Sequence, residues 1–205
     1  MDDQSRTLRN ANHPKRGDSI KVDPIKKPAE IKRIKKLLED TPRDYCLFTL
    51  GINTAYRAKE ILSITVGQVD YLKAGDRLEI KQSKTRKYRS VTLNETVVDA
   101  IEMWLKSHPD KRSEAPLFWS RKSRRALTVS AVNALVKKWC REAGVQGKNF
   151  GSHTLRKTWG YHQRKFNNQA LPLLMVAYGH ASEAQTLEYL CIDAEEVRDL
   201  YSMEL

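Results

Sequence analysis

Apolar residues recur every three or four positions along most of the chain, a spacing that predicts amphipathic helices. The first such stretch, residues 29–39, has aliphatic side chains on one face and lysines on the other. The next begins at Thr41-Pro42, a capping residue followed by a proline at the first helical position, and continues to about Gly51. A short third helix is expected over residues 58–63. Later helices are expected to begin near Asn94, Thr128 or Ser130, Thr154, Asn168 and Ser182.

In the middle of the chain, apolar residues alternate with polar ones, which predicts short strands. Three strands are expected, over residues 66–71, 77–82 and 88–93. The second and third are expected to form a hairpin whose turn lies at or near residues 83–87. The sequence therefore predicts a mainly α fold of the α+β type with a small three-stranded antiparallel sheet.

The chain divides into three parts. Its 205 residues are enough for one sizeable domain. Residues 1–27 are polar and interrupted by prolines and glycine, and are expected to form a flexible arm. Residues 28–192 contain the periodic segments and are expected to form the folded domain. Residues 193–205 are acidic, with Arg198 as the one basic residue, which predicts a tail that packs on protein, either its own or a neighbour's.

Composition narrows the class of partner and compartment. The chain has 37 Lys+Arg against 25 Asp+Glu, a net charge of +12. Such an excess favours a polyanionic partner, because each neutralised phosphate releases counterions. Cys46, Cys140 and Cys191 form no CxxC pair, which indicates reduced thiols and a cytoplasmic location. No apolar run reaches membrane-spanning length, and the start of the chain lacks a signal-peptide core, so no membrane partner is expected.

A histidine and an arginine stand three residues apart at a predicted helix start. These are His153 and Arg156, directly after Gly151-Ser152, and they share one helix face. Helix N-termini present free N–H groups to anions. Further along come His180, after a glycine, and Tyr189. Arginine grips phosphate with a planar fork, histidine moves protons, and tyrosine supplies an oxygen nucleophile. Together these residues predict a site that attacks a phosphodiester and keeps it as a covalent phosphotyrosine.

A second arginine, Arg57, directly precedes the short helix expected over residues 58–63. Glu60, one turn on, is placed to buttress its guanidinium. Taken singly, these residues have ordinary explanations, Arg57 and Glu60 as a surface ion pair and Tyr189 as a packing residue at a helix end. Their combination in one chain favours a reaction centre.

Five separated segments resemble the catalytic domain of the tyrosine recombinase (phage integrase) family. They follow the family's order and spacing, and the resemblance covers roughly residues 28–192, the expected catalytic domain. In size the chain is similar to the minimal recombinases that invert fimbrial promoters. The matching segments are Tyr56–Leu62, Ser83-Lys84-Thr85, His153–Arg156, Gly179-His180 and Tyr189.

The resemblance implies roles for the residues that form and break bonds. Tyr189 would attack the scissile phosphate, giving a 3′-phosphotyrosine and a free 5′-hydroxyl. Lys84 would protonate the leaving 5′-oxygen. His153 would assist proton transfer with the tyrosine and bond a phosphate oxygen.

The resemblance also implies how phosphate is held. Arg57 and Arg156 would neutralise the non-bridging oxygens in the transition state, and His180 would add a hydrogen bond. Neither a metal nor any other cofactor is expected, because two arginines supply the positive charge. A 5′-hydroxyl from another strand can reverse the attack without ATP, so the expected function is site-specific DNA recombination or integration.

The implied partners are double-stranded DNA, further copies of the chain in a tetrameric synapse, and accessory DNA-bending proteins. The resemblance also implies that the acidic tail, residues 193–205, docks as a helix on a neighbouring subunit. Such a protein is expected to associate with the nucleoid. Basic residues of the hairpin and of a later loop are expected to contact the DNA backbone, which positions the duplex without reading its sequence. These residues are Lys81, Arg86, Lys87, Arg89, Arg121, Lys122, Arg124 and Arg125.

The sequence departs from the family pattern in ways that leave the chemical groups intact. Ala55-Tyr56 stands where the family often has a glycine and an apolar residue, and Tyr178 stands where leucine is usual. The first 28 or so residues cannot form a helical DNA-binding domain, so the chain is either a minimal recombinase or part of a longer protein.

Two alternative functions remain open from sequence. One is a non-catalytic DNA-binding regulator with this fold, and the other is a DNA-relaxing enzyme similar to type IB topoisomerases, which would act without synapsis. A metal-dependent nuclease is disfavoured, because the five histidines have no carboxylate or cysteine at metal-ligand spacing.

Overall fold

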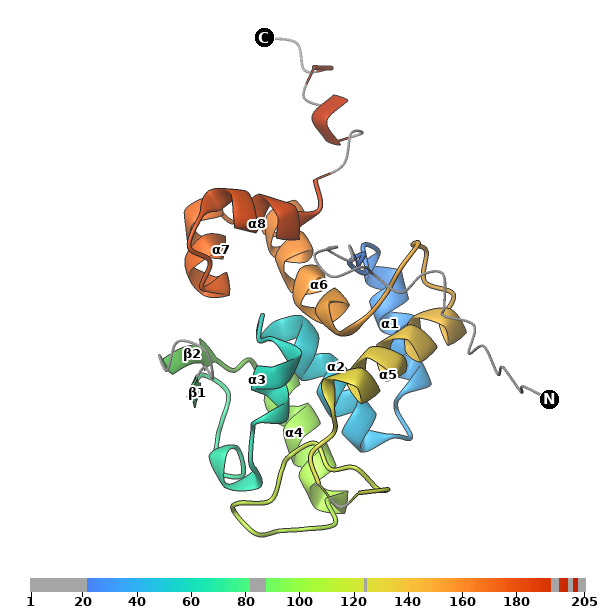
Figure 1. The fold of residues 1–205 in the computed structure, drawn as a ribbon, viewed down its shortest axis with the longest axis vertical. Helices are drawn as coiled ribbons and strands as arrows, with labels where there is room; N and C mark the ends of the chain where they lie inside the picture. Colours follow the sequence, from blue (N-terminus) through green and yellow to red (C-terminus); the bar gives the residue numbers. More distant parts are fainter. Residues whose placement is uncertain (1–21, 82–87, 124, 193–195, 199–200, 203–205) are drawn as a thin grey trace, which may run out of the picture.

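The computed structural model describes residues 22–81, 88–123, 125–192, 196–198 and 201–202, and its described part is mainly helical (Figure 1). The helices are α1 (Pro28–Leu37), α2 (Pro42–Asn53), α3 (Ala58–Leu62), α4 (Glu95–Ser107), α5 (Val129–Glu142), α6 (Ser152–Lys165), α7 (Leu171–Tyr178) and α8 (Glu183–Leu190). A 3-10 turn, η1 (Val66–Gln68), follows α3, and the strands are β1 (Arg77–Lys81) and β2 (Tyr88–Thr92).

The helix starts predicted at Pro42, Asn94, Thr128 and Ser182 are confirmed, whereas α6 begins two residues before the expected Thr154 and α7 three residues after the expected Asn168. Pro42 opens α2 in its first turn. The Asn94 side chain accepts a hydrogen bond from the Val97 backbone at 3.0 Å, and α4 begins at the next residue. Thr128, rather than Ser130, caps α5, and Ser182 caps α8. Each cap satisfies a backbone N–H that has no partner within its own helix.

The predicted hairpin is confirmed, whereas the predicted third strand is wrong. β1 and β2 pair antiparallel, with Leu78 opposite Val91 and Ile80 opposite Arg89. The expected turn, residues 83–87, lies outside the described residues. The expected strand over residues 66–71 is instead η1 and a turn, so the described part of the chain has a two-stranded sheet.

The segment around η1 turns because its apolar residues are three apart rather than alternating. Val66 and Val69 are both buried, which suits the eclipsed i,i+3 side chains of a 3-10 turn. The Gln68 side chain accepts the Thr65 N–H at 2.9 Å and closes the turn. Thr65 also forms an isolated antiparallel bridge with Pro116, which fixes the turn to the loop after α4.

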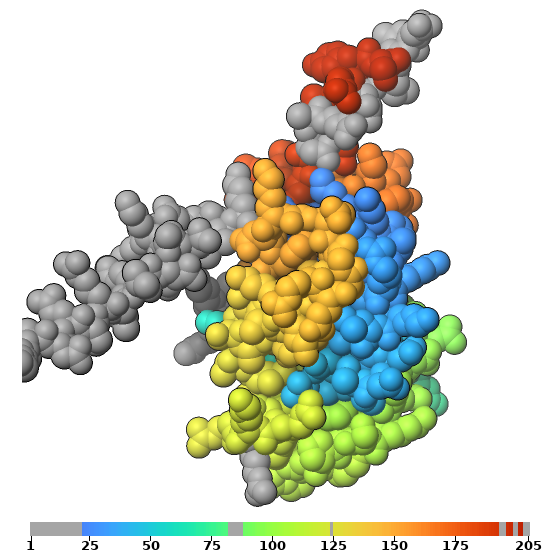
Figure 2. Space-filling model, turned by 90° about the vertical axis from the view of Figure 1, so that its right-hand side faces the viewer, coloured from blue at the N-terminus to red at the C-terminus, as the bar shows by residue number. Residues whose placement is uncertain are grey.

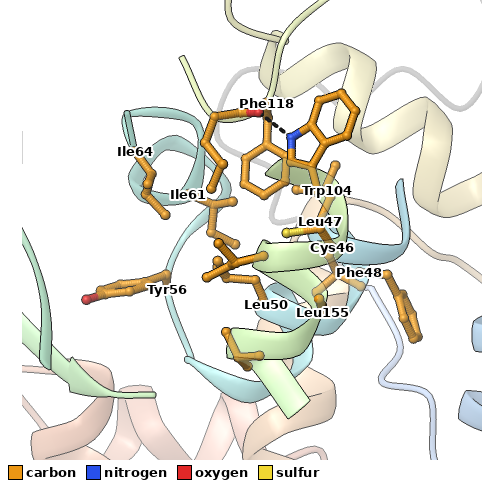
Figure 3. Close-up of a cluster of buried hydrophobic side chains, with 14 of the residues drawn as sticks. Cys46, Leu47, Phe48, Leu50, Tyr56, Ile61, Ile64, Trp104, Phe118 and Leu155 are labelled. Atoms are coloured by element: carbon orange, nitrogen blue, oxygen red, sulfur yellow. Dashed lines mark hydrogen bonds between the residues drawn. The ribbon is translucent and has the colours of Figure 1, made fainter. Parts of the chain in front are cut away.

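The main core gathers around α2, which packs against α4 and α6. Phe48 of α2 meets the Trp139 ring of α5 edge-on, with centroids 6.1 Å apart. Trp104 of α4 donates its indole N–H to the Leu117 carbonyl at 2.7 Å, the dashed line in Figure 3. Leu155 of α6 enters the same cluster, so the helix that begins at Ser152 is fixed to the core.

A second, smaller apolar cluster holds α7 and α8 in place. It contains Ala55, Leu174, Tyr178 and Leu190, and Trp159 packs against it. In Figure 1, α7 and α8 lie at one end of the molecule beside α6. Because Ala55 belongs to this cluster, the cluster joins the C-terminal helices to the segment before α3, where Arg57 lies.

Figure 2 shows from the side the blue surface of the N-terminal helices between the green and the orange segments.

Candidate active site

The structure brings His153 and Tyr189 together from opposite ends of two helices. His153 lies in the first turn of α6 and Tyr189 in the last turn of α8. The His153 Nδ1 atom and the Tyr189 hydroxyl oxygen are 2.9 Å apart, a hydrogen-bond distance. Tyr189 is half-buried and its side chain also packs on the second cluster. The phenol is therefore fixed while its oxygen contacts a group able to exchange a proton.

Arg156 occupies the centre of the site and is almost completely buried, with 1% exposure. Its guanidinium donates to the carbonyl oxygens of Ala55 and of Tyr178, the latter at 2.6 Å. It also lies over the ring of Tyr178 at 4.7 Å and over that of Tyr189 at 5.5 Å. Its Nε atom has no hydrogen-bond partner among the described residues. Backbone carbonyls and rings thus hold the cation without cancelling its charge.

The electrostatics of Arg156 reflect a cation without a carboxylate contact. Burial lowers its pKa to about 9, and the charges of Arg89 and Arg57 act in the same direction. A guanidinium keeps its proton under ordinary conditions, so the direction of the pKa shift means that keeping the charge at this buried position costs free energy. An incoming anion would offset that cost.

His180 is held as a neutral imidazole. Its ring stacks on Tyr178 with centroids 4.8 Å apart and an interplanar angle of 8°. Its Nε2 atom lies 3.3 Å from an Arg156 nitrogen, and its Nδ1 atom lies 3.1 Å from the Thr186 hydroxyl oxygen. Because a guanidinium only donates, Nε2 accepts, and we assign the ring proton to Nδ1. Burial, then the charges of Arg156 and Arg57, lowers the pKa of His180 to about 4.

The pKa of His153 is lowered as well. Burial is the largest cause, followed by the positive charges of Arg156, Arg57 and Lys157. A neutral His153 can accept the proton of Tyr189 at Nδ1 when the ring carries its own proton on Nε2.

Glu60 lies between two arginines. The expected support of Arg57 is present: Glu60 accepts the Arg57 backbone N–H at 2.6 Å and an Arg57 guanidinium N–H at 3.2 Å. The carboxylate also accepts a hydrogen bond from Arg89 at 3.1 Å. The Arg57 side chain remains 37% exposed, so part of its guanidinium faces solvent.

The basic residues expected to contact DNA fall into three groups. Lys81, Arg121, Lys122 and Arg125 are exposed. Arg89 differs from the prediction, because its side chain is buried against Glu60 and the Ala177 carbonyl. Lys84, which was expected to protonate the leaving group, lies outside the described residues, as do Arg86, Lys87 and Arg124.

Sequence reasoning missed Lys157, Thr186 and the role of Tyr178. Lys157 is buried, with its Nζ atom 5.6 Å from the centroid of the Tyr189 ring and 3.5 Å from the Cys191 sulfur. Its i,i+4 spacing from His153 was the available signal, since such residues share a helix face. For Tyr178, no sequence pattern indicates that its carbonyl holds Arg156.

The acidic tail is described only in part. Glu196 forms ion pairs with Arg164 and Lys165 at the end of α6, with nitrogen–oxygen distances of 2.6 and 3.6 Å. Most of residues 193–205, including the greater part of the expected docking helix, lies outside the described residues.

Residues 27–196 match the sequence pattern of the phage integrase family. The chain belongs to this family. It is 31% identical over 183 residues to the probable integrase/recombinase YoeC of Bacillus subtilis (strain 168), a match that covers 89% of this chain and 96% of YoeC. It is also 31% identical over 172 residues to tyrosine recombinase XerC of Caldanaerobacter subterraneus subsp. tengcongensis, covering 80% of this chain and 47% of XerC. It therefore spans about half the length of that relative.

The fold of this integrase-family chain is similar to that of the XerA recombinase. The two structures superpose with a TM-score of 0.72 at 24% identity, covering 96% of this chain and 68% of XerA. Family membership identifies the chain as a tyrosine recombinase, an enzyme that cleaves and rejoins DNA. Within the described residues, no helix is long and apolar enough to cross a membrane, and no cluster of metal-ligating side chains occurs.

Proposed function

We propose that this chain is a site-specific DNA recombinase that cleaves and rejoins strands through a 3′-phosphotyrosine intermediate, without metal or ATP. The observation that supports it best is the 2.9 Å contact between His153 Nδ1 and the Tyr189 hydroxyl, beside the buried guanidinium of Arg156. A base, a nucleophile and a cation are thus within reach of a single phosphate group.

In the cleavage step, the Tyr189 oxygen forms a bond to the scissile phosphorus while the bond to the 5′-oxygen breaks. His153 Nδ1 takes the phenol proton, which its lowered pKa and neutral state allow. Lys84 supplies a proton to the departing 5′-oxygen. After this step a 3′-phosphotyrosine, a protonated His153, a neutral Lys84 and a free 5′-hydroxyl remain, so bonds and protons balance.

Charge on the phosphate is neutralised by arginines. The partly exposed Arg57 guanidinium would bind the phosphate on its solvent side. The buried Arg156 guanidinium, which lies close to the Tyr189 ring, would bind it on its protein side. Such preorganised donors act where charge increases in the transition state. In the return step a 5′-hydroxyl attacks the phosphotyrosine and Tyr189 recovers its proton, so the phosphoester bond energy is conserved.

Double-stranded DNA is the substrate, and the synapse we propose is a tetramer of this chain on two duplexes. The net charge of +12 and the exposed Lys81, Arg121, Lys122 and Arg125 support contact with the phosphate backbone. With this function, the protein would associate with the nucleoid, and accessory DNA-bending proteins would bind at the synapse.

The test uses duplexes from DNA flanking the gene, nicked near the cleavage point so that the covalent complex is trapped. Wild type, Tyr189→Phe and a control variant, Tyr71→Phe at an exposed tyrosine, are compared on a denaturing gel in EDTA. We expect a covalent band from wild type and Tyr71→Phe that is absent from Tyr189→Phe. Binding of a verified site without any covalent band would contradict the proposal and favour a DNA-binding regulator.

A further inference from the structure

Arg89 of β2 joins three parts of the candidate site. One guanidinium nitrogen donates to Glu60 Oε2 at 3.1 Å, and the other donates to the Ala177 carbonyl at 2.5 Å. The guanidinium also lies over the Tyr56 ring at 5.1 Å, and the Tyr56 hydroxyl, which donates to the Leu78 carbonyl at 2.6 Å, lies 3.2 Å from the Arg89 carbonyl oxygen. With 9% exposure, the residue is an internal connector.

The first contact sets the orientation of the carboxylate that supports Arg57. One oxygen of Glu60 faces the Arg57 guanidinium, while the other accepts both the Arg57 backbone N–H and Arg89. A carboxylate held at both oxygens cannot rotate freely, and the charge-assisted hydrogen bond from Arg89 adds a second contact at Oε2. The direction of the Arg57 fork thus depends on Arg89.

The second contact fixes the end of α7. Arg89 holds the carbonyl of Ala177, and Arg156 holds the carbonyl of the next residue, Tyr178. Both carbonyls belong to the negative end of the helix, where guanidinium groups are favoured. Directly after them, Gly179 turns the chain in the left-handed conformation, with φ 64°, and leads to His180. The two adjacent arginine contacts therefore fix the position of the turn that leads to His180.

We propose that Arg89 is a positioning residue for strand cleavage, which orients Arg57 through Glu60 and His180 through the end of α7, and does not itself bind DNA. The inference rests on the proposed function, since it assigns a residue to that same reaction. It predicts that loss of Arg89 slows the chemical step and leaves DNA affinity unchanged.

The exposed Lys81, on the paired strand of the same hairpin, provides the matched control. Arg89→Met, Arg89→Lys and Lys81→Met are compared with wild type in two measurements. One is DNA affinity as a function of salt concentration. The other is the single-turnover rate of covalent complex formation at saturating protein, on nicked duplexes with either a normal or a 5′-bridging phosphorothiolate linkage. Circular dichroism and thermal unfolding establish that each variant is folded.

For Arg89→Met we expect unchanged affinity and salt dependence, and a cleavage rate lowered by about 10- to 100-fold, because misplaced reacting groups cost this much. A sulfur leaving group needs no proton, so the phosphorothiolate will not restore a rate lost through the arginines. The cleavage rate of Arg89→Lys should lie between those of wild type and Arg89→Met, because one ammonium group cannot reproduce a guanidinium that reaches two partners. Lys81→Met is the control for DNA contact only, and it should lower affinity and reduce the salt slope by about 1.

Three results would overturn the inference: a saturated rate of Arg89→Met equal to wild type, a salt slope lowered as in Lys81→Met, or full recovery on the phosphorothiolate. The last would mean that Arg89 acts through the proton donor instead. If Arg89→Met does not fold, the same criteria apply to Arg89→Lys. Absence of cleavage by wild type itself would refute the proposed function, whereas normal cleavage by the variants would refute this inference alone.

Discussion

Acid should destabilise the folded protein through His180, and replacing that residue should remove part of the effect. His180 has a folded-state pKa of about 4 against an ordinary value of 6.5. A histidine whose pKa is depressed on folding binds its proton more readily in the unfolded chain. Stability from this group is therefore fully present above pH 6.5, decreases as the pH falls, and is lost near pH 4.

The magnitude follows from the size of the shift. A difference of about 2.5 pKa units, at about 1.4 kcal/mol per unit, corresponds to at most about 3.4 kcal/mol, of which about 2.5 kcal/mol is expressed by about pH 4.5. His180 remains 8% exposed and solvent screens part of this energy, so we expect about 1 to 2 kcal/mol. Glutamine can accept from Arg156 and donate to Thr186, which makes His180→Gln the suitable variant.

The assay is urea unfolding followed by tryptophan fluorescence at about pH 7.5 and about pH 4.5, for wild type and His180→Gln. Wild type should lose about 1 to 2 kcal/mol more than the variant, because carboxylate protonation affects both proteins and cancels in the comparison. An equal loss in the two proteins would show that His180 is already charged when folded. An imidazolium cannot accept a hydrogen bond, so the assigned contact with Arg156 would then be wrong.

Two further predictions concern packing and anion binding. A Cβ added at Gly160 would lie 1.7 Å from the Tyr178 hydroxyl oxygen, so Gly160→Ala should lower the free energy of unfolding by about 1–3 kcal/mol. Adding Tyr178→Phe should restore part of this loss. A Gly160→Ala variant as stable as wild type in urea unfolding would contradict the prediction. Sulfate should raise the melting temperature by a few degrees more than chloride of equal ionic strength, because a bound anion stabilises the folded protein by mass action. Arg57→Met should lose this sulfate-specific difference, since its partly exposed guanidinium is removed. An equal sulfate–chloride difference in wild type and variant would indicate a general salt effect.

The local pattern was enough to predict most of the elements. Helix starts at Pro42, Asn94, Thr128 and Ser182 follow from side chains that cap or open helices, and the hairpin follows from alternation. At residues 66–71 a short stretch was interpreted as a strand, although its two buried valines lie three residues apart. Over so short a stretch, a strand and a 3-10 turn differ by little more than their backbone partners, which lie far away in the sequence.

Arg89 shows a signal that was present and not used. The same alternation that places Leu78 and Val91 on the buried face of the hairpin also places Arg89 there, directly opposite the buried Ile80. A charged residue at a predicted inward position requires a partner. The partner itself, Glu60, could not be inferred, because the contact depends on how β2 lies against α3.

The contacts within the site also depend on tertiary packing. The sequence placed His153, Arg156, His180 and Tyr189 in one centre by their order and residue types. It gave no indication that carbonyls of Ala55 and Tyr178 would hold Arg156, since those contacts require the second apolar cluster to bring α7 beside α6. The neutral state of His180 likewise follows from burial and neighbouring charge, which emerge only once the helices are packed.

The way in which the cations are held bears on both stability and reactivity. Among the described residues, Arg57 and Arg89 share the single carboxylate of Glu60, while Arg156 is held by backbone carbonyls and aromatic rings. A carboxylate beside Arg156 would have stabilised the empty site, but it would also have competed with a phosphate. Carbonyl oxygens orient the donors and leave the positive charge uncancelled, so the free-energy cost expressed in the lowered pKa of Arg156 is available to an incoming anion. Because the transition state of the proposed reaction carries more negative charge on its equatorial oxygens than a resting diester does, we expect the same arrangement to favour the transition state over the bound substrate.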